Sequence, residues 1–151
     1  MRTNLAGVCL AAACLCSAAC RPVSSPKSDA PSIVGTWLVK SPGAPFPYHM
    51  FAFHSDGTMQ QSNPDAGDSN TSDSDGMGVW ASDANGIRGK FVEVTADRNT
   101  RQFVSRGEIS FSIRVNGDRF SGSASALFFD VDGRKLKGPL AVTLEGQRIT
   151  P

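Results

Sequence analysis

Apolar and polar side chains alternate along residues 103–118. Ile109 and Phe111, for example, occupy odd positions, and the positions on either side of them are polar. Because successive side chains of a β-strand point to opposite faces, this pattern predicts a strand with one face in a core and the other in water. Asn116 and Gly117 tolerate positive φ angles, so a tight hairpin should follow.

The next segment, residues 119–131, alternates in the same way and carries small residues on its less polar face. Small residues within a strand let a sheet bend sharply or let a ligand approach closely. We expect room inside the fold at Gly107, Gly122, Ala124 and Ala126. A last strand is predicted over residues 135–146. Its inward side chains should be Leu136, Leu140, Val142 and Leu144, with Lys135 and Lys137 on the outer face.

Five shorter segments complete the pattern, and no helical periodicity stands out between them. They are residues 32–40, 48–54, 58–62, 78–82 and 90–96. The sequence therefore predicts an all-β fold, a single antiparallel up-and-down barrel of about eight strands. A β-sandwich is the alternative, but nearly every connection is short enough for a hairpin, which favours a meander.

Two connections should border the mouth of this barrel and gate entry to it, residues 41–47 and the polar stretch 62–76. The longer one cannot bury apolar area, so we expect a mobile loop. Asp68 and Asp73 have a spacing similar to that of calcium-binding loops, but Ser82 stands where an EF-hand needs its glutamate. A solvated loop is the main interpretation, a weak Ca²⁺ site is the alternative, and no metal ligand is assigned.

Residues 1–19 have the features of a secretory signal peptide, because Arg2 precedes an apolar run of fifteen residues. A spanning helix needs about 20 apolar residues, so a transmembrane anchor is the weaker interpretation. The run ends in the letters SAAC at Cys20, which resemble the lipobox of bacterial lipoproteins. The resemblance implies cleavage before Cys20 and a lipid on its thiol. Cys14 is a second candidate, and ordinary signal cleavage is the alternative.

Residues 20–31 would then be a lipidated cysteine with a flexible tether, and residues 32–151 the barrel domain. Each buried CH₂ of an acyl chain contributes about 0.8 kcal/mol to membrane binding, so several chains would hold a small domain firmly. We expect a location at the cell envelope, anchored by lipid to the periphery of a membrane and facing the periplasm or the cell surface. A chain without acylation at Cys20 would be secreted.

The formal net charge is +1 and no basic run occurs, which argues against nucleic-acid binding. No cysteine follows Cys20, so disulfides cannot stabilise the domain and the packing of one core must do so. Phosphate-binding loops are also missing from the sequence. We expect a monomer that needs no cofactor and that contacts a membrane only through its N-terminal lipid.

Gly35-Thr36-Trp37 lies at the start of the first predicted strand. It is similar to the Gly-x-Trp signature of lipocalins and their calycin relatives, in which the Trp plugs one end of the barrel and an Arg near the last strand packs over it. Arg148 occupies the matching position. Residues 33–149 also resemble small secreted bacterial proteins of lipocalin-like type. Because the Thr-Asp-Tyr motif of lipocalins is missing, the resemblance implies a calycin-like barrel rather than a lipocalin.

No catalytic residue is assigned, because the sequence lacks the Gly-x-Ser-x-Gly and His-Glu-x-x-His motifs. His49 and His54 are five positions apart on one predicted strand, so they should point to opposite faces and cannot share a metal. One enzymatic alternative needs few acids or bases, namely a small barrel that cyclises or isomerises an apolar substrate by holding it in one conformation. An interior Tyr48, His49 or Glu93 beside a cavity would favour it.

A barrel of eight strands either packs solid or holds one small ligand. The small residues inside favour a pocket, so the predicted function is the binding of a small apolar or amphipathic molecule. A protein-binding envelope inhibitor or assembly factor is a further alternative, which a solid barrel with an exposed apolar patch would favour. The residues predicted to bind the ligand are Trp37, Phe51, Phe53, Trp80, Phe111 and Phe128.

Overall fold

The structure, a computed structural model, describes residues 32–44, 46–62 and 69–151. The predicted signal peptide, Cys20 and the predicted tether lie outside these residues. No helix in the described part of the chain is long and apolar enough to cross a lipid bilayer. The strands are β1 (Gly35–Lys40), β2 (Tyr48–Phe53), β3 (Thr58–Ser62), β4 (Thr71–Asp73), β5 (Gly76–Asp83), β6 (Gly86–Asp97), β7 (Phe103–Asn116), β8 (Arg119–Phe129) and β9 (Lys135–Arg148).

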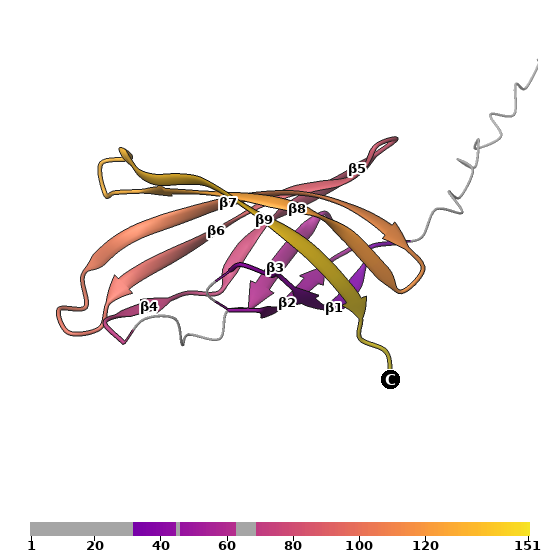
Figure 1. Cartoon of the computed structure of the whole chain (residues 1–151), viewed down its shortest axis with the longest axis horizontal. Helices are drawn as coiled ribbons and strands as arrows, with labels where there is room; N and C mark the ends of the chain where they lie inside the picture. The colour runs from indigo at the N-terminus through magenta and orange to yellow at the C-terminus, as the bar shows by residue number, and fades with distance from the viewer. Residues whose placement is uncertain (1–31, 45, 63–68) are drawn as a thin grey trace, which may run out of the picture.

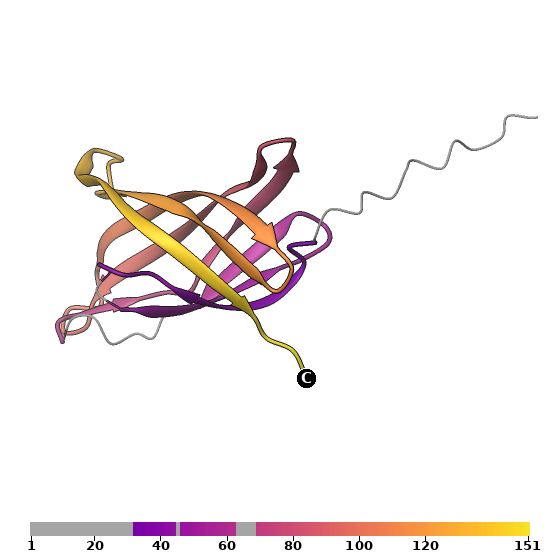
Figure 2. The ribbon, with the colours of Figure 1, turned by 45° about the vertical axis from the view of Figure 1, so that its right-hand side comes forward.

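Eight of these strands form a closed antiparallel barrel, seen from two sides in Figure 1 and Figure 2. Apart from β4, each strand pairs with the next one along the chain, and β9 pairs back with β1, where Trp37 lies opposite Arg148. The predicted all-β, up-and-down barrel is therefore confirmed. The alternation that predicted it is also present, since Phe111 and Ile113 of β7 are buried and Ser112 between them is exposed.

The predicted loop over residues 62–76 is partly a strand. Residues 63–68 lie outside the described part of the chain, but β4 pairs with the end of β6 and places Asp73 opposite Thr95. The Thr95 hydroxyl donates a hydrogen bond of 2.7 Å to the Asp73 carboxylate. The prediction of a loop was wrong over β4 because it assumed that polar side chains must face water. Here Thr71 and Asp73 line the barrel interior, and Asp73 binds Thr95 of β6.

Aromatic rings pack the half of the barrel that lies toward the described chain ends. Phe51 and Phe91 meet edge to face with their centroids 5.8 Å apart, and Phe53 and Phe111 do so at 6.0 Å. Edge-to-face pairs of this kind contribute about 0.5–1.5 kcal/mol each beyond the area that they bury. This layer forms a dry core across the barrel.

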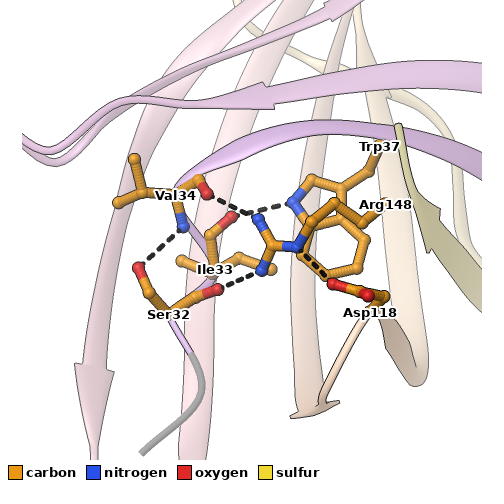
Figure 3. Close-up of polar contacts among 6 residues, drawn as sticks. All are labelled: Ser32, Ile33, Val34, Trp37, Asp118 and Arg148. Carbon is orange, nitrogen blue, oxygen red and sulfur yellow. Dashed lines mark hydrogen bonds and ion pairs between the residues drawn. The ribbon is translucent and has the colours of Figure 1, made fainter. Parts of the chain in front are cut away.

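On the side of this layer where the described chain begins and ends, a plug closes the barrel (Figure 3). The plug is made of Ser32, Ile33, Val34, Trp37, Asp118 and Arg148. Trp37 is fully buried and donates its indole N–H to the Ile33 carbonyl oxygen at 2.8 Å. The Arg148 guanidinium carbon lies 4.2 Å from the centre of the Trp37 ring, so the expected contact between these two residues is present. Arg148 also donates to the Val34 carbonyl at 2.7 Å and to the Asp118 carboxylate at 3.0 Å. Cation–π and backbone contacts thus tie the first and last strands together.

The register of β9 departs from the predicted alternation near its start. The pairing with β8 shifts between Ala126 and Phe128, and as a result Lys137 lies opposite Phe128. A shift of one residue reverses which face each side chain occupies. The prediction that Lys137 points outward was therefore wrong, since Lys137 shares the face of Phe128 and lines the cavity. Leu136 also lines the cavity, although it is 57 % exposed. Gly138 accommodates the irregularity, since its φ is +99° and a Cβ there would lie 2.4 Å from a carbonyl oxygen of β8.

Candidate functional site

The barrel is hollow in the half opposite the plug. A cavity of about 750 Å³ opens at the mouth formed by the connection between β1 and β2 and by the first residues of β7 and β9. Ser41, Gly43, Ala44 and Phe46 of the predicted mouth loop 41–47 border it, whereas Pro45 lies outside the described residues. The predicted position of this loop at the mouth is confirmed.

The aromatic layer closes the inner end of the cavity, and its surface toward the mouth forms the cavity floor. Phe51 and Phe91 line it and are themselves almost fully buried, as are Ala124 and Leu144 beside them. These side chains belong to both the core and the cavity wall. The floor is therefore apolar and is packed on its far side by the rest of the aromatic layer.

One wall of the cavity is apolar and comes from β8 and β9. Ala124 and Ala126 line it together with Leu140 and Val142, which lie opposite them in the β8–β9 ladder. The methyl groups of the two alanines leave the space that larger side chains would fill, as predicted. A ligand placed here would bury apolar area, at about 25 cal/mol for each Å² removed from water.

The two glycines predicted to leave room have other roles. At Gly107 a Cβ would lie 3.0 Å from the Glu93 side chain, so that side chain already occupies the space. At Gly122 a Cβ would lie 2.7 Å from the Cα of Ile113 on the neighbouring strand. Gly122 therefore allows two backbones to approach closely and adds nothing to the cavity.

The opposite wall of the cavity is polar and comes from β2, β3, β4, β6 and β7. Its side chains are His49, Gln61, Asp73, Glu93, Thr95 and Ser105, which we call the polar wall. Gln61 is 2 % exposed, yet its amide oxygen accepts the Gly76 N–H at 3.2 Å and its amide nitrogen lies 3.1 Å from Nδ1 of His49. Because the Gly76 N–H fixes the oxygen end of the amide, Gln61 donates to Nδ1, and a neutral His49 ring carries its proton on Nε2.

Ion pairs among the described residues gather outside the barrel. On the outer face, Glu108 binds Lys90 and Arg106. The hydrogen bond from Lys90 lowers the pKa of Glu108 below its usual value, and Arg106 acts in the same direction. Within the described ranges no group of three or more His, Cys, Asp or Glu side chains could hold a metal ion.

The structure divides the six aromatic residues predicted to bind a ligand into two groups. Phe51 and Phe128 line the cavity. Trp80 packs edge-on against a core phenylalanine and donates its indole N–H to two backbone carbonyls of the β2–β3 turn. Ligand binding by any of the six stays a prediction. The four that lie away from the cavity, in the packed half of the barrel, are Trp37, Phe53, Trp80 and Phe111.

The polar wall supplies cavity-lining residues that the predicted binding set did not include. A sequence signal for two of them existed, because His49 shares its parity with Phe51 and Glu93 shares its parity with Phe91. Both line the cavity, whereas Tyr48 is 51 % exposed. The sequence favours an ordinary strand-end histidine at position 49. The structure instead places His49 on the cavity wall.

No protein-family model, no curated protein and no solved structure matches this chain. The likeness to lipocalins and to bacterial lipoproteins therefore rests on the quoted residues alone. The closed barrel of eight antiparallel strands, with an arginine packed over a tryptophan at one end, is consistent with a calycin-like fold.

Proposed function

We propose that this protein binds one small apolar or amphipathic molecule in the mouth half of its barrel. The cavity of about 750 Å³ is the observation that carries the proposal. Sites for small molecules usually enclose about 300–1,000 Å³ and are mostly apolar with a few polar groups. The apolar wall and the polar wall together meet this description, because an amphipathic ligand could contact both at once.

A phenylalanine at position 126 should weaken binding strongly, because its ring would fill the space beside the apolar wall. We expect the uncharged probe N-phenyl-1-naphthylamine to gain fluorescence with wild-type protein and to bind Ala126→Phe at least about tenfold more weakly. Thermal unfolding should change little, since the ring enters an existing cavity. Fluorescence titration measures the affinity.

The control is Ser123→Phe, which places the same ring on the exposed outer face of β8. It should bind the probe as wild type does. Equal affinity in all three proteins, or no fluorescence gain with wild type, would refute binding in the cavity.

We propose further that the barrel is held at the cell envelope by a lipid on Cys20. The described chain starts at Ser32 within the plug, at the end of the barrel away from the mouth (Figure 1, Figure 3). A membrane anchor upstream of Ser32 would thus leave the mouth free to face the aqueous side. This orientation suits a protein that takes up its ligand from solution.

Cys20→Ala should move the protein from the membrane pellet to the soluble fraction in bacterial cells, because several acyl chains would be lost at once. Mass spectrometry of the wild-type membrane fraction should find an acylated N-terminal Cys20. The control Cys14→Ala should remain in the pellet. Loss of acylation in Cys14→Ala instead, or a wild-type protein without lipid, would contradict the assignment.

An isomerase or cyclase is the second candidate, and the location of His49 and Glu93 on the cavity wall favours it. A ligand that binds in the titration can be incubated with wild-type and His49→Ala protein and then separated by chromatography. Formation of an isomer by wild type alone would support catalysis, and unchanged ligand in both would leave binding as the function. A protein-binding role was expected of a solid barrel, whereas this barrel is hollow in its mouth half.

A further inference from the structure

Strands β7, β8 and β9 carry exposed apolar side chains where they reach the mouth of the barrel. Arg106 of β7 lies opposite Phe129 at the end of β8, and Phe129 lies opposite Lys135 at the start of β9. The three strands therefore end at one level, and Figure 1 shows the β6–β7 and β8–β9 turns at the end of the barrel opposite the C-terminus. We call the exposed apolar side chains at this end the lip, which consists of Phe103, Val104, Val131, Leu136 and Leu140.

The lip is continuous with the apolar lining of the cavity. Val131, in the β8–β9 turn, is 79 % exposed, and Leu136 beside it on β9 is 57 % exposed. Val104, Leu136 and Leu140 also line the cavity, so apolar surface extends from the cavity wall to the outside of the barrel. Single exposed apolar side chains are ordinary, whereas a group of them marks a surface that interacts with a protein, a membrane or a ligand.

Cationic side chains surround the lip. Arg101, Lys135 and Lys137 are exposed, and none of them forms an ion pair with another described residue. Residues 101–106 and 129–140, which contain the lip, hold five Lys or Arg and two Asp. Positive charge is therefore in excess at the lip.

The acidic side chains nearest the lip are engaged within their own turns. Asp97 accepts backbone N–H groups of the β6–β7 turn at 2.8 and 2.7 Å, and Asp130 accepts the backbone N–H of Arg134 at 2.7 Å. Asp132 pairs with the Arg134 guanidinium at 2.8 Å. Exposed apolar side chains with unpaired cations around them are typical of surfaces that lie in the interface of anionic membranes.

We propose that the lip docks on the surface of an anionic lipid bilayer. Val131 and Leu136 lie among the lipid head groups, while Arg101, Lys135 and Lys137 meet the phosphates. A bilayer presents both chemistries that the lip matches, since its phosphates lie directly above hydrocarbon. The inference goes beyond the proposed function, because docking needs no ligand in the cavity. It adds a second membrane contact to the N-terminal lipid expected from the sequence.

Sedimentation with lipid vesicles tests the inference. The sample is Cys20→Ala protein from the soluble fraction, which carries no acyl chain. At low salt it should bind phosphatidylcholine vesicles that contain about one third phosphatidylglycerol, and it should bind pure phosphatidylcholine at least about tenfold more weakly.

Two lip variants in the same background should bind the anionic vesicles less well. Arg101→Gln combined with Lys135→Gln should weaken binding about tenfold or more, because each cation near an anionic surface contributes about a factor of five. Val131→Ser should weaken binding about threefold through the lost apolar burial. None of these three residues lines the cavity, so N-phenyl-1-naphthylamine should bind both variants as it binds wild type when no vesicles are present.

Matched changes elsewhere on the barrel are the controls. Arg114→Gln combined with Arg119→Gln removes the same net charge beside the β7–β8 turn at the plug end, and Met77→Ser removes a side chain that is 71 % exposed on β5. Both should bind the vesicles as the Cys20→Ala protein does. The inference would be overturned by no binding to anionic vesicles, which is the result expected if the lip receives a protein, by unchanged binding of a lip variant, or by equal losses in the controls. None of these results would touch the proposed function, which the probe measures without vesicles.

Discussion

Trp37→Ala is expected to destabilise the barrel by about 3–5 kcal/mol, the usual range for truncating a buried tryptophan. The Trp37 ring is fully buried, packs against Phe120 with centroids 5.1 Å apart and supports the Arg148 guanidinium. Its removal leaves a cavity in the plug and takes away the surface under the half-buried Arg148 guanidinium. Urea unfolding of both proteins measures the loss of free energy.

The control for this prediction is Met77→Ala, which truncates a large apolar side chain that is 71 % exposed on β5. Its free energy of unfolding should stay within about 0.5 kcal/mol of wild type. If Trp37→Ala were as stable as Met77→Ala, the plug would not close the barrel as described.

Gly122→Ala should be the next most damaging change, at about 3 kcal/mol, near the upper end of the usual range for overpacking. A Cβ at this position would lie 2.1 Å from the Ser112 carbonyl oxygen and 2.7 Å from the Ile113 Cα. Both atoms belong to the backbone of β7, so rotation of a side chain cannot relieve the clash. The β7–β8 ladder must separate locally, and urea unfolding should report the loss.

Ser123→Ala on the same strand is the comparison, because its side chain is exposed and points away from the interior. We expect a change within about 0.5 kcal/mol. A Gly122→Ala protein as stable as wild type would mean that β7 and β8 do not approach as closely as the barrel requires.

The alternation of apolar and polar residues predicted the barrel, because this pattern depends only on which face of a strand each side chain occupies. That signal located Phe111 and Ile113 in the core and placed His49 and Glu93 on the same faces as core phenylalanines. It failed at Lys137, because the irregular pairing near Gly138 depends on the neighbouring strand and leaves no mark on the alternation itself.

The contents of the barrel could be predicted only in part. Small side chains indicated space, but Ala126 borders the cavity whereas Gly122 borders a neighbouring backbone. Distinguishing the two needs the distance between strands, which composition does not contain. The pairing of Asp73 with Thr95 was missed for a similar reason, since a polar segment resembles a solvated loop until its partner inside the barrel is known.

The most direct test of the account is an isotope-filtered nuclear Overhauser experiment on the labelled barrel with bound N-phenyl-1-naphthylamine. We predict contacts from the aromatic protons of the probe to the methyl groups of Ala126, Leu140 and Val142, which line the cavity. Contacts confined to outward side chains such as Val79, which is 61 % exposed, would contradict it.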